Sequence, residues 1–290
     1  MKNGIVYLDK KVGMTTLKDE YTIRKNFHTD KTGHGGTLDP FASGLVLIGI
    51  NKGTKVLPFY ENKKKMYRAL LQLGEQRDTG DKDGKTVLAQ AYRIHEEDEI
   101  QDVLHSFLGE SEQLPPMYSA LKKNGVPLYK FAYKGIEVER KPRKIQIDAI
   151  SLIQYVPEKG TIEFEVKVSK GTYIRVLGED IAKKLGEVGY LTALRRTAVG
   201  NISVSEAKKA EDIKESDIVP IREIFQDLPQ VRIDEDQMKR VQNGTDMKLT
   251  PSQLDFSSPG MILVLDSEGE GLALYQKADG TWYKSFKQFI

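Results

Sequence analysis

The residues best suited to chemistry lie in a glycine-rich stretch, residues 31–44 (KTGHGGTLDPFASG), which runs into the apolar segment 45–50. Its central acid is Asp39. Pro40 keeps Asp39 out of the helical region, and the glycines before the acid permit positive φ and close approach of a ligand. The spacing therefore predicts a carboxylate held extended at the mouth of a strand. Asp-Pro is also a common turn opener, so the dipeptide alone predicts no site.

A carboxylate in that position suits a reaction that develops positive charge on carbon. When a glycosidic bond breaks, the anomeric carbon becomes cationic, and an anion can trap or stabilise it. A hydrolase acting on a small glycoside would need a second catalytic carboxylate. No other acid in the sequence stands out for that role.

The amino-acid composition excludes several other kinds of catalytic and metal site. The chain contains no cysteine, which excludes disulfides, zinc–thiolate sites and thiolate nucleophiles. Its histidines, at positions 28, 34, 95 and 105, show no metal-ligand spacing such as HExxH. We therefore expect neither a metal nor a cofactor.

A tyrosine begins the apolar face of another predicted strand. Within residues 63–74, Tyr67, Ala69, Leu71 and Leu73 share one face by the two-residue period. On composition alone, a tyrosine in such a place is more often part of the core than a catalytic residue.

Two polar residues lie where a strand is predicted to give way to a helix. Residues 162–168 alternate as a half-exposed strand, and after Gly171 apolar residues recur at helical spacing until about Gly186. Tyr173 and Arg175 fall at the start of this helix, where free N–H groups and the helix dipole favour anions. An arginine there can equally be an ordinary surface residue.

Residues 115–144 combine basic and aromatic side chains. The segment carries 8 basic and 2 acidic residues, a balance of +6, with tyrosines and a phenylalanine between them. Cations that meet phosphates and rings that stack on splayed bases are typical of RNA-binding segments. A solvated, partly helical insertion is the alternative.

Periodicity and turn signals indicate an α+β fold in two parts. We predict helices over residues 17–27 and 97–108, and a linker at 220–229. Three short strands separated by glycine-containing turns follow the linker. The expected domains are a larger one at 1–228 and a small all-β one at 229–290.

The two parts of the chain also differ in net charge. Residues 1–210 carry 35 Lys/Arg and 27 Asp/Glu, or +8, while residues 211–290 carry 9 and 15, or −6. A basic surplus suits a polyanionic partner. No apolar run approaches the ~18 residues that span a bilayer, and the amino terminus has a charge too early for a secretory signal. We expect a cytoplasmic protein that does not enter a membrane.

Over its whole length the glycine-rich stretch resembles the signature loop of the TruB family of tRNA pseudouridine synthases. Further stretches match motifs of that family in the same order, as far as about residue 228: residues 9–16, 63–74, 115–144, 169–177 and 190–200. The family usually has Pro where this chain has Lys11, Ser near Thr15, and Thr or Ala in place of Gly35.

The resemblance implies a role for each candidate residue. Asp39 is implied as the catalytic carboxylate, Arg175 as its partner, and Tyr67 as an active-site residue stacked on the target base. Four residues are implied to bind the substrate or support the site: Tyr173 lining the pocket, Leu194 as an apolar wall for the base, His34 filling the gap that the base leaves, and Lys10 beneath the site.

The resemblance also implies the fold and the reaction. The fold is a mixed β-sheet catalytic domain of the pseudouridine synthase type, with residues 115–144 as an RNA-gripping thumb and a PUA-like domain at the end. The reaction isomerises the T-loop uridine of tRNA to pseudouridine, with the T arm as partner, no cofactor and a monomeric enzyme. A non-catalytic tRNA-binding or folding chaperone on the same scaffold is the alternative, against which intact Asp39, Tyr67 and Arg175 argue.

Overall fold

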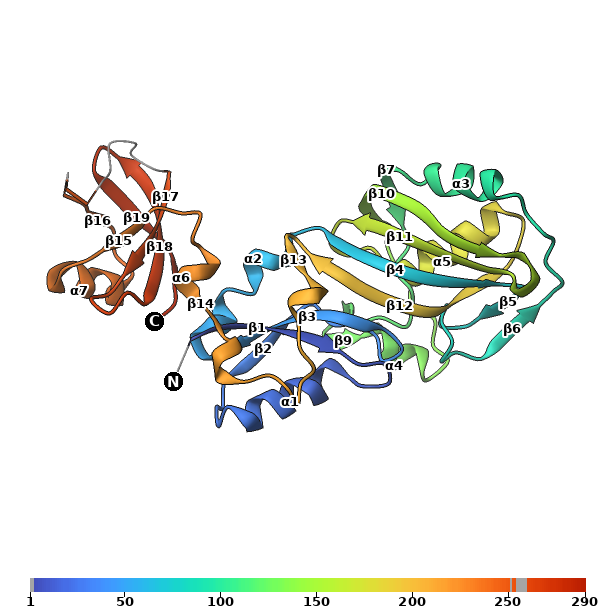
Figure 1. Ribbon diagram of the computed structural model, residues 1–290, viewed down its shortest axis with the longest axis horizontal. Helices are drawn as coiled ribbons and strands as arrows, with labels where there is room; N and C mark the ends of the chain where they lie inside the picture. Colours follow the sequence, from blue (N-terminus) through green and yellow to red (C-terminus); the bar gives the residue numbers. More distant parts are fainter. Residues whose placement is uncertain (1–2, 251, 254–259) are drawn as a thin grey trace.

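The computed structural model describes residues 3–250, 252–253 and 260–290. The molecule is elongated, with a large sheet that runs through its centre and right side in Figure 1 and a small strand-rich unit at its left end. The carboxyl-terminal residue, Ile290, lies close to the junction between these parts (Figure 1).

The large sheet has 10 strands, in the order β14-β1-β3-β12-β4-β11-β10-β7, with β2 added on β3 and β13 on β12. Their bounds are β1 Gly4–Lys10, β2 Thr32–Gly35, β3 Ser43–Ile50, β4 Lys65–Leu73, β7 Gly109–Gln113, β10 Arg143–Val156, β11 Thr161–Val168, β12 Gly189–Val199, β13 Ile202–Ser203 and β14 Val219–Pro220. The β12–β3 junction is parallel and pairs Arg195 with Ser43 and Arg196 with Gly44. The sheet is therefore mixed, as predicted.

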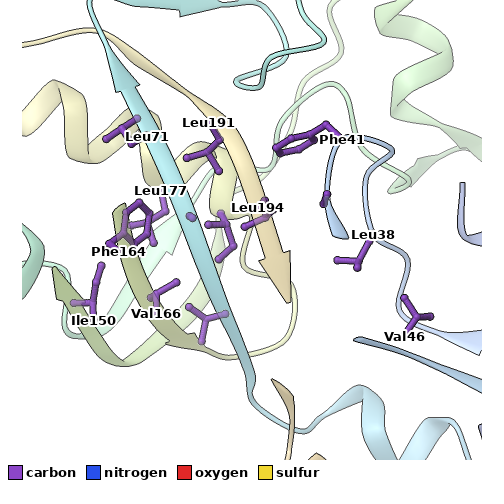
Figure 2. Packing of buried hydrophobic residues seen from close by; sticks show 14 of the residues in the cluster. Leu38, Phe41, Val46, Leu71, Ile150, Phe164, Val166, Leu177, Leu191 and Leu194 are labelled. Carbon is purple, nitrogen blue, oxygen red and sulfur yellow. The ribbon is translucent and has the colours of Figure 1, made fainter. Parts of the chain in front are cut away.

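Helices and short two-stranded ribbons connect the strands of this sheet. They are α1 Thr16–Asn26, α2 Pro58–Glu61, α3 Glu97–His105, α4 Leu128–Ala132, α5 Ile174–Lys184 and α6 Ile221–Ile224, with the ribbons β5 Glu75–Arg77 with β6 Thr86–Ala89 and β8 Lys122–Lys123 with β9 Val126–Pro127. The main core fills the space between α5 and the sheet, where Leu177 lies near Leu71, Phe164 and Leu191 (Figure 2). From the facing loop, Leu38 and Phe41 join the same core.

The elements follow the periodicity of the sequence closely. Helix α1 begins after Thr15, whose hydroxyl accepts a hydrogen bond from the N–H of Lys18, as a side-chain cap does. Strand β3 is buried along almost its whole length because alternate residues belong to two different buried clusters, Val46 and Ile48 to one and Leu45 and Leu47 to the other. The predicted helix at 97–108 ends earlier, at His105, and that histidine lies on the surface.

The small unit forms a 5-stranded sheet in the order β15-β17-β18-β19-β16. Its strands are β15 Gln230–Arg232, β16 Met247–Lys248, β17 Met261–Leu265, β18 Gly271–Asp279 and β19 Trp282–Gln288. It also contains helix α7, Glu235–Asn243, which the sequence analysis did not predict. Asp234 starts this helix with a capping box shared with Gln237, a signal that was readable at residues 234–237.

A second core joins the two parts of the molecule. Leu45 and Leu47 of β3 belong to the same buried cluster as Leu263 and Leu274 of the small sheet. The rings of Phe225 and Phe289 stack with their centroids 5.6 Å apart. Phe59 of α2 meets Phe225 edge-on (5.2 Å) and lies 6.4 Å from Phe286, which extends this cluster toward α2. The small unit is therefore packed on the back of the strand that follows the Asp39 loop.

Within the described ranges, no helix combines the length and apolar character needed to cross a bilayer.

Candidate active site

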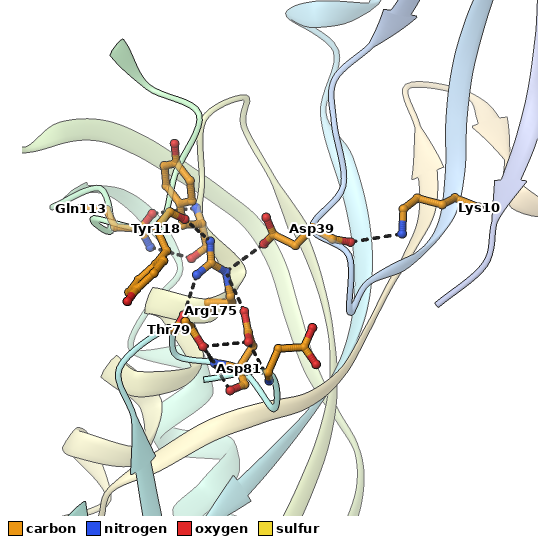
Figure 3. Close-up of polar contacts among 9 residues, drawn as sticks. Lys10, Asp39, Thr79, Asp81, Gln113, Tyr118 and Arg175 are labelled. Atoms are coloured by element: carbon orange, nitrogen blue, oxygen red, sulfur yellow. Dashed lines mark hydrogen bonds and ion pairs between the residues drawn. The ribbon is translucent and has the colours of Figure 1, made fainter. Parts of the chain in front are cut away.

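The Asp39 loop connects β2 to β3, and a buried lysine holds its backbone from below. Lys10, at the end of β1, is fully buried and donates from Nζ to the carbonyl oxygens of Asp39 (3.2 Å), Pro40 (3.3 Å) and Ala42 (2.6 Å). The carbonyl oxygens of Asp39 and Pro40 also accept from the N–H groups of Ala42 (3.0 Å) and Gly13 (2.8 Å), and the ammonium adds a shared donor that draws the three carbonyl groups of the turn together. Figure 3 shows Lys10 reaching this backbone from the side opposite the carboxylate.

Burial changes the acidity of this lysine. Desolvation lowers the pKa of Lys10 to about 8, while the carboxylates of Asp19 and Asp39 oppose that change. The lysine therefore supports the site, as the resemblance implied, but it does so through the loop backbone.

An arginine of β12 holds the other side of the same loop. Arg196 is buried and donates from Nε to the carbonyl oxygen of Leu45 (2.6 Å) and from Nη2 to that of Gly36 (3.0 Å). Gly44 has a φ of 106°, and a Cβ there would lie 2.3 Å from the carbonyl oxygen of Arg196. Only glycine fits this close approach, which lets the loop enter the sheet at its parallel junction.

Arg175 forms the centre of the polar network above the loop. From the first turn of α5 it donates from Nε to Oδ2 of Asp39 (2.8 Å), from Nη1 to the carbonyl oxygen of Thr79 (2.5 Å) and from Nη2 to that of Tyr118 (2.7 Å). Its side chain is 4% exposed, whereas that of Asp39 is 42% exposed. The guanidinium thus aims an accessible carboxylate from a buried position (Figure 3).

A second carboxylate, Asp81, lies behind Arg175 and was not predicted. Its Oδ2 lies 3.6 Å from Nε of Arg175, and its Oδ1 accepts from the Thr79 hydroxyl (2.8 Å) and the Asp83 N–H (3.0 Å). Burial raises the pKa of Asp81, and the hydrogen bond from Thr79 and the charge of Arg175 oppose that rise. In the sequence, residues 78–84 are typical of a polar turn, so nothing local indicated a contact with Arg175.

Asp39 and Arg175 border a cavity of about 520 Å³, within the ~300–1,000 Å³ usual for small-molecule sites. Tyr67, Tyr173 and Leu194 line the same cavity. Tyr67 and Leu194 come from adjacent strands, because β4 and β12 pair Tyr67 with Arg196 and Ala69 with Leu194. The structure therefore brings five of the seven sequence-predicted site residues to one cavity. Lys10 and His34 do not line it.

A glutamine that the sequence analysis missed orients Tyr173. Gln113, buried at the end of β7, accepts from the Tyr173 N–H (2.8 Å) and donates to the Tyr173 carbonyl oxygen (3.1 Å). The pair ties the start of α5 to the strand that precedes the thumb. Burial raises the pKa of Tyr173, so its hydroxyl stays protonated at neutral pH.

His34 lies on β2 and points away from the cavity toward α1. Its Nδ1 lies 2.6 Å from Oε2 of Glu20, and the side chain is 21% exposed. The neighbouring Gly35 faces the other way, where a Cβ would lie 3.3 Å from Cδ2 of Leu57. The strand is thus closely packed at Gly35, the position where the TruB pattern usually has a larger residue.

The thumb-like segment 115–144 is a small folded unit. The ribbon β8–β9 turns at Asn124 and Gly125, both with positive φ, and leads into α4. Rings of Tyr118 and Tyr129 pack edge-on against Tyr133, which is 77% exposed. Because the Tyr118 carbonyl oxygen accepts from Arg175, the base of this segment contacts the network around Asp39.

No group of three or more metal-binding side chains occurs within the described ranges.

Comparison with known proteins identifies the family. The profile of the TruB family pseudouridylate synthase (N terminal domain) matches residues 24–174. A tRNA pseudouridine synthase B from Syntrophotalea carbinolica is 38% identical over 276 residues, which cover 92% of this chain and 90% of the relative. The chain belongs to the TruB family of pseudouridylate synthases. This confirms the membership predicted from the motifs, and it makes the protein an isomerase of the pseudouridine synthase class.

Other TruB relatives and a solved structure agree with this. The tRNA pseudouridine synthase B of Bacillus subtilis is 38% identical over 289 residues, covering 95% of this chain and 93% of the relative. A chain in the crystal structure of a Cbf5-Nop10-Gar1 complex has a TM-score of 0.69 and 25% identity, covering 99% of this chain and 85% of that chain. The mixed-sheet fold and the strand-rich end predicted from the sequence are thus those of a TruB-type protein.

Proposed function

We propose that this TruB protein converts the T-loop uridine of tRNA to pseudouridine, with Asp39 as the catalytic carboxylate. The observation that carries the proposal is an exposed carboxylate held 2.8 Å from a buried arginine, at a cavity with two tyrosines and a leucine on its walls. Relatives that share 38% identity over most of their length are named tRNA pseudouridine synthase B, which supports tRNA as the substrate.

The reaction is an isomerisation and needs no external group. The N1–C1′ bond of uridine breaks, the uracil turns, C5 bonds to C1′, and the proton on C5 leaves while N1 gains one. Cleavage develops positive charge at C1′, which the Asp39 carboxylate stabilises or traps. Attack on C1′, attack on the ring and removal of a C2′ proton all require the same ionised group beside the nucleoside, and Arg175 directs it there.

The cavity walls suit a single extruded base. Tyr67 offers a ring on which uracil stacks, and its hydroxyl is available to handle the C5 proton directly or through water. Leu194, from the neighbouring strand, adds an apolar surface, and Tyr173 also lines the cavity. Arg143, Lys144 and Lys170 also line the cavity, where they would meet the flanking phosphates.

We assign a separate function to each part of the chain. We assign residues 1–228 to catalysis, with 115–144 as the thumb that grips the T arm, and residues 229–290 to a PUA-like domain. The thumb meets RNA through its +6 balance and its exposed rings. We further propose that the enzyme acts as a cytoplasmic monomer, without a cofactor or a protein partner.

Mapping of the modified nucleotide tests the proposal. Unmodified tRNA is incubated with the protein, and pseudouridine is located by chemical labelling and mass mapping, which separates isomers that share one mass. We expect one new pseudouridine, in the T loop. Binding of tRNA without any new pseudouridine would favour a tRNA-folding chaperone, and pseudouridine elsewhere in the tRNA would overturn the T-loop assignment.

A further inference from the structure

Strand β2 presents two different faces. Thr32 and His34 point to α1 because side chains alternate along a strand. Gly33 and Gly35 point the opposite way, where Cβ atoms would lie 3.5 Å from Thr54 and 3.3 Å from Leu57. The strand is therefore packed on its glycine face, which fixes the direction in which His34 projects.

One carboxylate of α1 binds both side chains on the other face. Oε1 of Glu20 accepts from the Thr32 hydroxyl (2.8 Å), and Oε2 lies 2.6 Å from Nδ1 of His34. The Glu20 side chain is 13% exposed. Both oxygens are thus occupied, so the carboxylate cannot rotate without breaking one of these contacts.

This contact determines how the imidazole is presented. An ionised carboxylate only accepts hydrogen bonds, so Nδ1 of His34 must be the donor. The ring is then held by one nitrogen, while Nε2 meets no hydrogen-bond partner among the residues that the structure describes. The His34 side chain stays 21% exposed, and His34 precedes Asp39 by five residues in the chain.

We propose that Glu20, together with Thr32, is a positioning residue that holds His34 ready to replace the uridine when that base leaves the T loop. The inference rests on the proposed function above. Extruding a base costs a few kcal/mol of stacking, and a side chain that enters the vacated space offsets part of that cost. A ring already fixed in one orientation loses little conformational freedom when the RNA arrives.

A double-mutant cycle tests this role on a T-arm hairpin that carries 2-aminopurine beside the target uridine, whose fluorescence rises as the uridine unstacks. We expect Glu20→Ala to slow the fluorescence rise and single-turnover pseudouridine formation by roughly two- to tenfold, the usual cost of ordering one side chain. We expect His34→Ala to slow both steps at least as much. In the His34→Ala background, Glu20→Ala should have no further effect.

The controls separate positioning from folding. Glu211→Gln removes a carboxylate that pairs with Lys11 at the exposed surface, and it should leave both steps unchanged. If Glu20→Ala does not fold, Glu20→Gln keeps the volume and an acceptor for Thr32 and carries the same cycle. Equal losses from the Glu20 variant in both backgrounds, or no loss at all, would overturn the proposal.

Failure here differs from failure of the proposed function. If wild-type protein forms T-loop pseudouridine but Glu20 and His34 are not coupled, only the positioning role is wrong. If wild-type protein forms no pseudouridine in tRNA, the proposed function itself is wrong.

Discussion

The two walls of the Asp39 cavity are held by different kinds of contact. On the loop wall, Lys10 and Arg196 bind main-chain carbonyl oxygens of residues 36–45. On the facing wall, Arg175 binds the Asp39 carboxylate itself and reaches the backbone of Thr79 and Tyr118. The loop wall therefore fixes the position of the Asp39 backbone. The facing wall supplies the positive charge beside the Asp39 carboxylate and connects it to segment 115–144.

The comparison teaches how one exposed acid is kept in place. A carboxylate paired with one exposed base would gain little, because surface ion pairs contribute about 0–1 kcal/mol. Here the partner guanidinium is almost wholly buried, donates to two carbonyl oxygens and lies 3.6 Å from the Asp81 carboxylate, so its position does not depend on Asp39 alone. The loop likewise keeps its shape through Lys10 and Arg196, whose contacts do not involve the reactive oxygens.

Removing the negative charge of Asp39 should have the largest effect on the reaction rate. Asp39→Asn keeps the size of the side chain and the restraint from Pro40, but it removes the anion. We expect single-turnover tritium release from C5-labelled tRNA to fall by several powers of ten, while tRNA affinity changes by less than about tenfold. A variant that keeps a tenth of the wild-type rate would remove Asp39 from catalysis, and a parallel loss of binding would make it a structural turn residue.

Weakening the contacts of Arg175 on the facing wall should have the next largest effect on the reaction rate. Arg175→Lys keeps a positive charge but cannot reach Asp39 and the carbonyls of Thr79 and Tyr118 at the same time. We expect the single-turnover rate to fall roughly 10²–10³-fold, the range seen when one preorganised donor is lost. Arg195→Lys is the matched control, since Arg195 pairs with Asp9 on the other face of β12. Equal losses in both variants would mean a general defect of the sheet.

Lys10→Met tests the support beneath the loop. The variant removes the Nζ donor from the carbonyl oxygens of Asp39, Pro40 and Ala42, which should lower the free energy of unfolding at pH 7 by about 1–3 kcal/mol. The pKa of Lys10 is about 8 in the folded protein and about 10.5 when unfolded. Between these values the unfolded state binds more protons, so this residue makes wild-type stability rise with pH.

The measurement is urea unfolding of both proteins between pH 7 and 10. The wild-type advantage over Lys10→Met should grow as pH rises through this window. Comparing the two proteins cancels the contribution of Lys65, whose pKa burial also lowers to about 8. A constant difference across the window would show that Lys10 is not desolvated in the fold.

Four basic residues of segment 115–144 do not line the cavity, and changes to them should have the smallest effect on chemistry. Replacing Lys122, Lys123, Arg140 and Lys141 with Ser should weaken tRNA binding and leave the single-turnover rate at saturation almost unchanged. Each lost phosphate contact should flatten the slope of log affinity against log salt by about 0.7–0.9. An unchanged slope would indicate that these charges are only solvated.

Much of the fold followed from local sequence. Alternation predicted β4 and β11, and helical patterns predicted α1, α3 and α5, because each pattern repeats with the period of its own element. The helix α7 was missed although its capping box is local. Its apolar positions are few, so turn and strand signals around it dominated the interpretation.

Less of the candidate site than of the fold could be predicted from local sequence. Asp39, with its glycines and proline, is a local pattern, and the sequence by itself indicated that this carboxylate would lie in a loop just before a buried strand, which is β3. The contacts around it come from residues far along the chain: Arg175 is 136 positions from Asp39, and Arg196 is 151 positions from Leu45. Asp81, Gln113 and Glu20 gave no local signal, because polar residues in turns, at strand ends and on helix surfaces are common. Only tertiary packing decided that Asp81 and Gln113 lie behind Arg175 and Tyr173 and that Glu20 meets His34, since a buried polar group has to find its partner wherever the fold brings one within hydrogen-bond distance.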